Sequence, residues 1–307
     1  MIRFKFIITL VLGMIALSAC TEKVNDITVI AGDNDNLTIL VDALEQAGLV
    51  DDLQAEGPFT VFAPTNQAFQ DLLDSNPAWN ELSDIPTATL TDVLLFHVVS
   101  GNIMAGDLSD TYVNTLATGP NMEPLSLQVS VTGGVTFNGS AIPSTTDVEA
   151  DNGVVHIINK VMLPPNVVNL AVNNGEFTSL VAALTRADLT TDYLSILNGD
   201  GPFTVFAPTN AAFEALLESD ENWNTLADIP VATLEAVLNY HVVNGANVQA
   251  DQLTDGQTVT ALGGTFDIDL SNGAQINTTS GQTVDIVITD VQGTNGVVHA
   301  INTVLLP

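Results

Sequence analysis

Basic residues are scarce in this chain of 307 residues, which has five Lys and Arg against 36 Asp and Glu and a formal net charge of −31. A protein that binds nucleic acid without sequence preference needs Lys and Arg to displace counterions from phosphates. The composition therefore excludes that class of function. Because 46% of the residues are hydrophobic and the mean hydropathy is positive, the chain can bury a core and is not a disordered acidic tail.

Cysteine and histidine are also scarce, with one Cys and four His in the whole chain. A single Cys excludes a disulfide framework and any zinc or iron–sulfur site built from clustered cysteines. The sequence contains no Gly-x-Ser-x-Gly, phosphate loop, dinucleotide fingerprint or His-Glu-x-x-His motif. We therefore expect a protein that is not an enzyme and that uses no cofactor and no metal ion.

The N-terminal residues 1–19 have the layout of a secretory signal peptide. Arg3 and Lys5 precede an apolar run that is too short for a good transmembrane anchor, and small residues follow it. The segment Leu17-Ser18-Ala19-Cys20 resembles a bacterial lipobox, and this resemblance implies cleavage before Cys20 and lipidation of Cys20. The alternative is an ordinary signal peptide with an incidental cysteine.

Lipidation at Cys20 predicts the location of the mature chain. Residues 20–23 would form a lipidated tether, and several acyl chains give stable anchoring where one is marginal. Thr21 follows the cysteine, whereas an Asp there often retains bacterial lipoproteins at the inner membrane. We therefore expect a chain in the cell envelope, outside the cytoplasm and anchored in the outer membrane. Cleavage leaves three bases against all 36 acids, a net charge of −33.

Two copies of one unit make up most of the chain. The ten residues GPFTVFAPTN at 57–66 recur unchanged at 201–210, and the later segments DIP, HVV and NGVVH recur in the same order. A repeat of this length is typical of tandem domains rather than of solenoid units. We predict one domain over residues 24–165 and a second over residues 166–307, with a short linker around Pro165.

Each copy begins with helical patterns and continues with strand patterns. Leu and Val residues between 37 and 44 form one apolar helix stripe, and Gly48 follows as a helix end. A strand at 59–63 and a helix after Pro86 come next. The rest of each copy is rich in Thr, Val and Gly, with alternating apolar residues as in 125–131, which predicts short antiparallel strands. The predicted fold class is α+β.

These repeated segments resemble the fasciclin domain family. The similar blocks occur in order at residues 59–66 and 203–210, at Tyr240-His241, and at residues 153–164 and 296–307. The resemblance covers essentially the whole mature chain. It implies two tandem domains, each a β-wedge of two sheets with several packed helices, and a role in cell adhesion or surface interaction rather than in catalysis.

The resemblance also implies a candidate partner-binding site, because the Tyr-His neighbourhood of this family has been implicated in receptor contacts. Tyr240 and His241 are the candidates in copy 2, and Phe96 and His97 are their weaker equivalents in copy 1. Copy 1 has Phe where the family has Tyr, which puts any role of that hydroxyl in doubt there. The alternative is that these side chains pack in the core.

All four histidines recur in the repeat, which suggests either a metal or catalytic pair in each domain or a structural role. His97 and His241 share helix faces with Leu and Val, and His156 alternates with apolar residues in a strand, as does His299. An imidazole in such a place needs hydrogen bonds, since an unpaired buried polar group costs about 1–3 kcal/mol. We therefore favour buried histidines that bond to backbone groups.

The segment Asp33-Asn34-Asp35-Asn36 suggests calcium binding but does not continue as a calcium loop. An EF-hand that began at Asp33 would have ligands or Gly where this chain has Leu37, Thr38 and Leu44. We expect a turn that caps the following helix instead.

The favoured function is a non-enzymatic adhesion or interaction lipoprotein, with a protein or polysaccharide surface as its partner and the membrane as its anchor. The alternative is a small-ligand or polysaccharide-binding module that uses a groove or aromatics such as Trp79 and Trp223. The short tether would keep domain 1 near the bilayer, so we expect domain 2 to contact the partner. The oligomeric state is left open.

Overall fold

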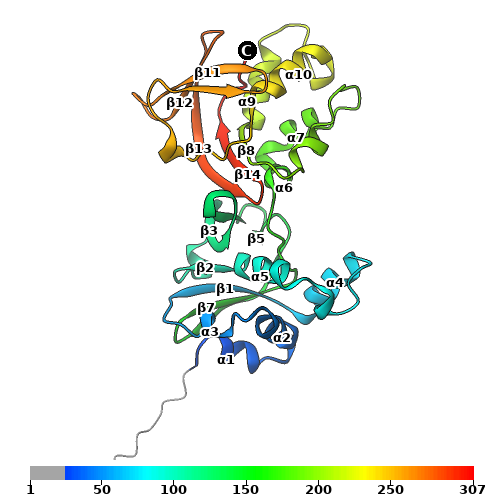
Figure 1. Cartoon of the computed structure of the whole chain (residues 1–307), viewed down its shortest axis with the longest axis vertical. Coiled ribbons are helices and arrows are strands. Elements are labelled where there is room, and N and C mark those ends of the chain that lie inside the picture. The colour runs from blue at the N-terminus through cyan, green and yellow to red at the C-terminus, as the bar shows by residue number, and fades with distance from the viewer. Residues whose placement is uncertain (1–24) are drawn as a thin grey trace, which may run out of the picture.

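The computed structural model describes residues 25–307, which form two α+β domains stacked along the long axis of the molecule (Figure 1). Each domain has one seven-stranded sheet and five α-helices in this part of the chain. The predicted fold class and the predicted tandem architecture are confirmed. The signal peptide, Cys20 and the tether lie outside the described residues.

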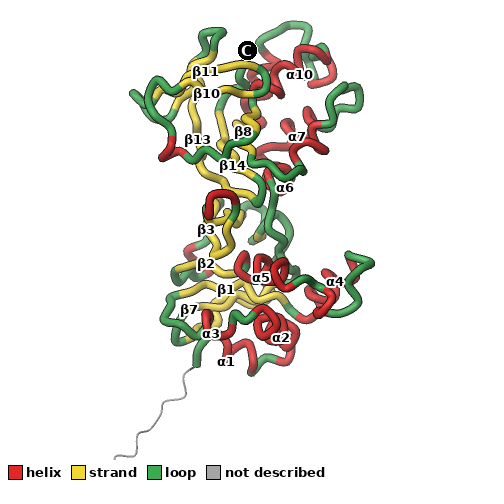
Figure 2. The backbone as a smooth tube through the Cα atoms, in the orientation of Figure 1, coloured by secondary structure: helices red, strands yellow, loops and turns green. Residues whose placement is uncertain are grey.

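In the chain, the α-helices of domain 1 come before its first strand and between its first two strands. Figure 2 shows helices and strands together in each of the two domains. Its helices are α1 (Ile27–Gly32), α2 (Thr38–Ala47), α3 (Val50–Leu53), α4 (Asn66–Ser75) and α5 (Thr87–Phe96). Its strands are β1 (Phe59–Pro64), β2 (Val98–Ser100), β3 (Thr111–Thr118), β4 (Pro124–Ser130), β5 (Thr136–Phe137), β6 (Pro143–Ala150) and β7 (Gly153–Ile158). The order across the sheet is β5-β4-β3-β2-β1-β7-β6.

Domain 2 repeats this succession of elements. Its helices are α6 (Val167–Asn173), α7 (Thr178–Leu184), α8 (Tyr193–Leu197), α9 (Asn210–Glu218) and α10 (Val231–Tyr240). Its strands are β8 (Phe203–Pro208), β9 (Val242–Asn244), β10 (Thr258–Ala261), β11 (Gly264–Asp269), β12 (Gln275–Thr278), β13 (Thr283–Gly293) and β14 (Gly296–Ile301). The order is β10-β11-β12-β13-β14-β8-β9.

Local sequence features determine where the first helices begin and end. Helix α2 ends before Gly48, whose φ of 70° is in the left-handed region that glycine adopts without a steric cost. Helix α4 begins after Thr65, whose side chain accepts a hydrogen bond from the backbone N–H of Ala68. The predicted strand at 59–63 is β1, and the predicted strand at 125–131 is β4.

The later strands of each domain pair antiparallel with one another, as expected, but one pair that includes the first strand is parallel. Strands β1 and β7 run parallel, from Phe59 opposite Gly153 to Pro64 opposite Ile158, and β8 and β14 do the same in domain 2. The reason is topological. After β1 the chain passes through helices and the outer strands, and the β6–β7 hairpin then brings it back beside β1 at the end where β1 began.

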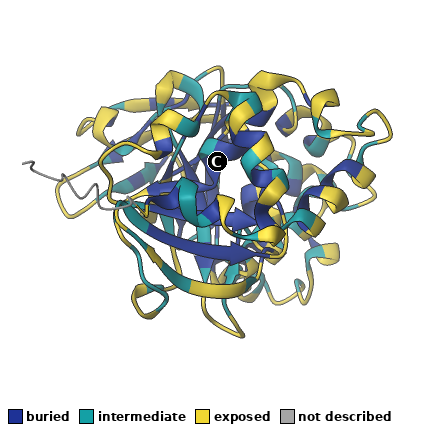
Figure 3. Ribbon diagram, turned by 90° about the horizontal axis from the view of Figure 1, so that it is seen from below, coloured by how far each residue is buried: buried dark blue, intermediate teal, exposed yellow. Residues whose placement is uncertain are grey.

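Each domain buries two apolar clusters, one between the helices and the sheet and one inside the folded sheet. Figure 3 shows buried strands in the middle of the molecule and helices whose outer faces are exposed. Among residues 25–307 no helix has the length and apolar character needed to span a bilayer.

Candidate functional site

The four sequence-predicted partner-binding residues lie at the C-terminal ends of two equivalent helices. Phe96 is the last residue of α5 and His97 follows it as the cap, while Tyr240 and His241 occupy the same places after α10. All four are buried, with exposed fractions of 0%, 2%, 1% and 3% respectively. None of these side chains offers surface to a partner in this conformation.

The two helix-capping histidines make the same pair of backbone hydrogen bonds. Nδ1 of His97 lies 2.7 Å from the carbonyl oxygen of Val93, and Nε2 accepts a hydrogen bond of 2.9 Å from the backbone N–H of Met162. Because the first partner can only accept and the second can only donate, the ring is neutral with its hydrogen on Nδ1. Burial lowers the pKa of His97 to about 4.

In domain 2, His241 bonds to the carbonyl of Val237 at 2.7 Å and accepts from the N–H of Leu305 at 3.0 Å. Burial lowers its pKa to about 4 as well. Each histidine therefore ties the end of a helix to the last residues of its own domain. This is the structural role that the repeat pattern favours.

Tyr240 has a polar partner that Phe96 lacks. Its hydroxyl donates a 2.6 Å hydrogen bond to the carbonyl of Thr265 on β11, and its ring packs edge-on against Phe266 with 5.6 Å between ring centroids. Phe96 instead packs within the second apolar cluster of domain 1. The contribution of these four residues to partner binding stays a prediction, and any such contribution has to pass through the backbone that they hold.

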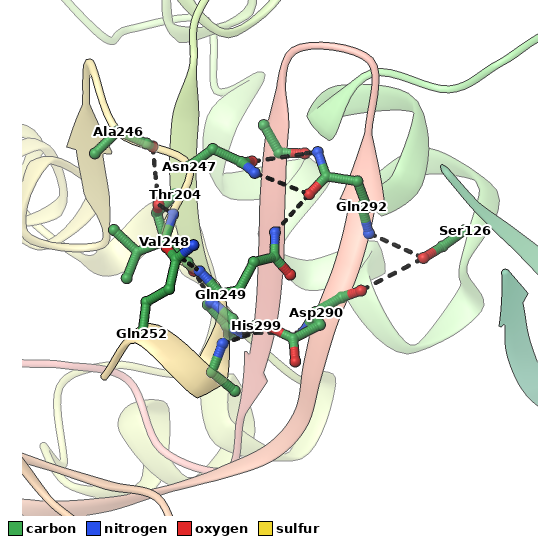
Figure 4. Close-up of polar contacts among 12 residues, drawn as sticks. Ser126, Thr204, Ala246, Asn247, Val248, Gln249, Gln252, Asp290, Gln292 and His299 are labelled. Carbon is green, nitrogen blue, oxygen red and sulfur yellow. Dashed lines mark hydrogen bonds and ion pairs between the residues drawn. The ribbon is translucent and has the colours of Figure 1, made fainter. Parts of the chain in front are cut away.

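The other two histidines close a bulge in the hairpin that ends each domain. Nε2 of His299 lies 2.9 Å from the carbonyl of Val248, and Nδ1 accepts from the N–H of Asp290 at 3.2 Å (Figure 4). Asp290 has a φ of 61°, and its carboxylate accepts from the N–H of Ala250 at 2.7 Å. Burial is the main cause that lowers the pKa of His299.

His156 makes the matching contacts in domain 1, to the carbonyl of Ile103 at 2.8 Å and from the N–H of Asp147 at 3.3 Å. The φ of Asp147 is 58°. All four histidines are thus buried and bonded to backbone groups, as predicted. Each holds a helix end or a bulged strand in place.

The structure shows no arrangement that would support metal chemistry in the described part of the chain. No group of three or more His, Cys, Asp and Glu among residues 25–307 could hold a metal ion. The segment around Asp33 is a turn, in which the side chain of Asn34 accepts from the N–H of Asn36 at 3.0 Å before α2. Trp79 and Trp223 are half-buried and pack against the cores of their domains.

The domains meet at a polar contact, the joint, formed by the β3–β4 hairpin of domain 1 and the β13–β14 hairpin of domain 2. The Ser126 hydroxyl accepts a hydrogen bond of 2.9 Å from the backbone N–H of Gln292 and lies 3.5 Å from the carbonyl of Asp290, to which it can donate (Figure 4). Strand β12 pairs with β13 only between Thr283 and Asp285. The hydroxyl therefore occupies a part of the β13 edge that no strand among residues 25–307 pairs with.

A buried amide cluster supports the joint from the side of domain 2. The Gln292 side chain donates to the carbonyls of Gly293 and Gly296 at 2.8 and 3.0 Å. Its oxygen accepts from the amides of Gln249 and Asn247 at 2.7 and 3.1 Å. Because these buried amides have partners, the cluster adds specificity to the joint without leaving uncompensated polar groups.

Side chains around this contact extend the joint. Tyr112 from β3 packs against the core of domain 2, and its hydroxyl accepts from the Asn174 amide at 2.8 Å. Asn121 in the β3–β4 turn donates to the carbonyl of Asn247 at 3.2 Å. A Cβ at Gly119 would lie 2.7 Å from the carbonyl oxygen of Gly293, so only glycine fits there. Sequence reasoning missed this joint entirely.

The comparison with known families identifies both halves of the chain. The sequence profile of the family described as Fasciclin domain matches residues 35–164 and 175–307. The solved FAS1 domain pair of the insect cell adhesion molecule fasciclin I is similar over 90% of this chain and 98% of that chain, with a TM-score of 0.51 and 16% identity. That likeness concerns the fold.

The relatives differ in how much of their own length matches this chain. Protein sll1483 of Synechocystis sp. is 40% identical over 147 residues, which are 48% of this chain and 78% of that protein. Transforming growth factor-beta-induced protein ig-h3 of Sus scrofa is 30% identical over 83% of this chain, and human periostin is 30% identical over 84%. These matches span only 36% and 29% of those two proteins.

Proposed function

This chain belongs to the fasciclin domain family, and from that premise we propose that it is a non-enzymatic surface interaction protein that mediates adhesion through its two tandem domains. The observation that carries the proposal is the pair of fasciclin domains, which contact each other at the joint. The family includes a cell adhesion molecule. The buried histidines support it, because they are committed to backbone groups and are not available for catalysis.

We propose that the mature chain is anchored in the outer membrane through lipid on Cys20. The lipobox-like segment and the short tether support this proposal. Helix α1 lies at one end of the long axis and the C-terminus at the other (Figure 1). With the anchor just before residue 24, domain 1 sits against the bilayer and domain 2 projects toward a partner.

The predicted site residues act within this proposal as positioning residues. Tyr240 supports β11 through the carbonyl of Thr265, and His241 ties the end of α10 to the C-terminal segment. Both residues therefore hold the outward end of domain 2. Phe96 and His97 hold the equivalent region of domain 1, which faces the joint.

The proposal is tested by deleting the gene and measuring attachment of the cells to surfaces and to one another. We expect attachment to fall and to return on complementation with the full chain. Complementation with Cys20→Ala, which removes the lipidation site, should not restore it although the protein is still secreted. Unchanged attachment of the deletion strain would contradict the adhesion function. Full rescue by Cys20→Ala would contradict the anchor alone.

A further inference from the structure

At the joint, one face of domain 1 binds part of domain 2, and this contact indicates what the same face of a fasciclin domain can bind. On domain 1 that face is the outer side of the β3–β4 hairpin, where Tyr112 and Ser126 are covered by domain 2. The contacted group is the uncovered edge of β13, with its backbone N–H at Gln292 and its carbonyl at Asp290. The occupant of the face on domain 1 is thus the edge of a β-hairpin.

The equivalent face of domain 2 can be located from paired contacts. In domain 1, Asp110 lies just before β3 and Val131 just after β4, and the carboxylate of Asp110 accepts a hydrogen bond from the N–H of Val131. In domain 2, Asp255 lies before β10 and Leu270 just after β11, and the carboxylate of Asp255 accepts from the N–H of Leu270. In the first ladder Val113 and Leu127 pair and pack in an apolar cluster, as Val259 and Phe266 do in the second. The outward-facing pairs on either side, Asn114–Ser126 and Tyr112–Gln128, therefore correspond to Thr260–Thr265 and Thr258–Asp267.

This equivalent surface, which we call the distal face, consists of Thr258, Thr260, Thr265 and Asp267, with Leu262 in the turn between the strands. All five side chains are exposed, and Leu262 is 49% exposed. Thr265 occupies the position of Ser126, but neither its hydroxyl nor that of Thr260 has a hydrogen-bond partner among residues 25–307. The face that is covered on domain 1 is open on domain 2.

A difference in hairpin length explains why the distal face stays open within the molecule. Asn114 and Ser126 are 12 positions apart, whereas their equivalents Thr260 and Thr265 are five positions apart. The seven additional residues in domain 1 include the turn with Gly119 and Asn121, which approaches domain 2. Domain 2 lacks this longer turn. The distal face therefore has no equivalent of the contacts that Gly119 and Asn121 make between domain 1 and domain 2.

We propose that the distal face of domain 2 is the partner-binding surface, and that its occupant is the exposed edge of a β-hairpin in a partner protein. This inference rests on the proposed adhesion function and names its site. The Thr265 hydroxyl bonds to the backbone N–H and carbonyl of the strand edge, as Ser126 does at the joint, and Leu262 supplies apolar contact. Strand β11, which carries Thr265 and Asp267, lies at the end of the molecule away from α1 (Figure 1).

The buried Tyr240 gains a role in this arrangement. Its hydroxyl donates to the backbone carbonyl of Thr265, the residue whose side chain would contact the partner. A change at Tyr240 can therefore alter partner binding although the side chain never touches the partner.

The probe for this inference is a cyclised peptide with the sequence of residues 288–299, which form the hairpin that fills the equivalent face of domain 1. It is titrated into the 15N-labelled mature chain, with a scrambled peptide of the same composition as the control. We expect saturable amide shifts confined to residues 258–267, with a Kd of about 1 mM, as a small contact supports. Thr265→Arg should weaken binding at least ~10-fold at an unchanged overall spectrum.

Two further variants keep this test decisive. Thr87→Arg, on an exposed helix start in domain 1, should bind the peptide like the parent. Thr260→Arg replaces Thr265→Arg if the latter perturbs folding. The inference is overturned if the peptide gives no shifts, if shifts map elsewhere, or if the distal face responds to a neutral oligosaccharide such as cellohexaose and not to the peptide. If the peptide does not bind but deletion of the gene still abolishes attachment, the distal-face inference fails and the adhesion function is retained.

Discussion

The side chain of Ser126 in domain 1 accepts a hydrogen bond from the backbone N–H of Gln292 in domain 2, and both residues are only 1% exposed. The Ser126 hydroxyl of domain 1 thus bonds to backbone groups of β13 that a neighbouring strand would otherwise satisfy. Because the partner groups are buried backbone groups, the contact fixes the angle between the domains more strictly than an exposed contact would.

Removing this hydroxyl should loosen the joint without unfolding either domain. Ser126→Ala leaves the N–H of Gln292 without a partner, which costs about 1–3 kcal/mol of contact free energy. We expect a broader distribution of interdomain distances between spin labels at Glu56→Cys and Glu221→Cys, both exposed positions. Asn114→Ala, opposite Ser126 in the ladder but exposed, is the matched control and should keep the parent's narrow distribution. An equally narrow distribution in Ser126→Ala would refute the rigid joint.

Acidification should destabilise both domains before the carboxylates titrate. Burial lowers the pKa of His97 and of His241 from 6.5 to about 4. The unfolded chain therefore binds more protons between these values, so stability is fully present above pH 6.5 and falls as the pH drops toward 4. Each histidine can contribute about 2 kcal/mol to the loss between pH 7.5 and pH 5. Denaturant unfolding at pH 7.5 and pH 5 measures it.

The control for the pH effect is a variant that cannot titrate. His97→Gln and His241→Gln each remove one ionisable ring, so the difference in unfolding free energy between the two pH values should shrink for the domain concerned. The assignment to these histidines fails if the pH dependence is the same in the parent and in both variants.

The Tyr240 hydroxyl should stabilise domain 2 and leave domain 1 unaffected. Tyr240→Phe removes the donor to the carbonyl of Thr265 and should cost about 1 kcal/mol, the usual contribution of one part-buried hydrogen bond. Domain 1 is an internal reference, because Phe96 already stands at the equivalent position. Hydrogen exchange measured separately for each domain reports the effect. Equal protection of domain 2 in the parent and in Tyr240→Phe would show that the hydroxyl does not contribute to stability.

Salt should stabilise the protein. The chain carries 36 acids against five bases, and among residues 25–307 one ion pair joins an Arg to a carboxylate, Arg186 with Asp188 at 2.7 Å. Raising the ionic strength from 0.1 to 1 M shortens the Debye length from about 10 to about 3 Å, which relieves repulsion and removes few attractions. We expect a higher melting temperature in NaCl and in KCl alike. A fall in both salts would contradict this.

Much of the fold could be predicted because its signals are local or repeated. Gly48 ends a helix through its own backbone preference, and the buried histidines follow from the apolar faces that carry them. The parallel pairing of β1 with β7 could not be predicted, because it depends on how the chain returns over many residues.

The joint has a signal in the sequence, but its meaning appears only in three dimensions. The connection between the paired positions of β3 and β4 is seven residues longer than its repeat, and this mismatch between copies marks the element that contacts domain 2. A length difference alone does not say which side chain faces the other domain. Only the structure shows that Ser126 is buried there while Thr265, its equivalent, is exposed.

The central claim, that this chain mediates adhesion, is tested most directly with beads coated with the mature protein at a fixed density and laid over the cells that produce it. Our account predicts that the beads are retained and that soluble mature chain releases them in a saturable manner. Retention no greater than that of beads coated with an equally acidic, unrelated protein would contradict it.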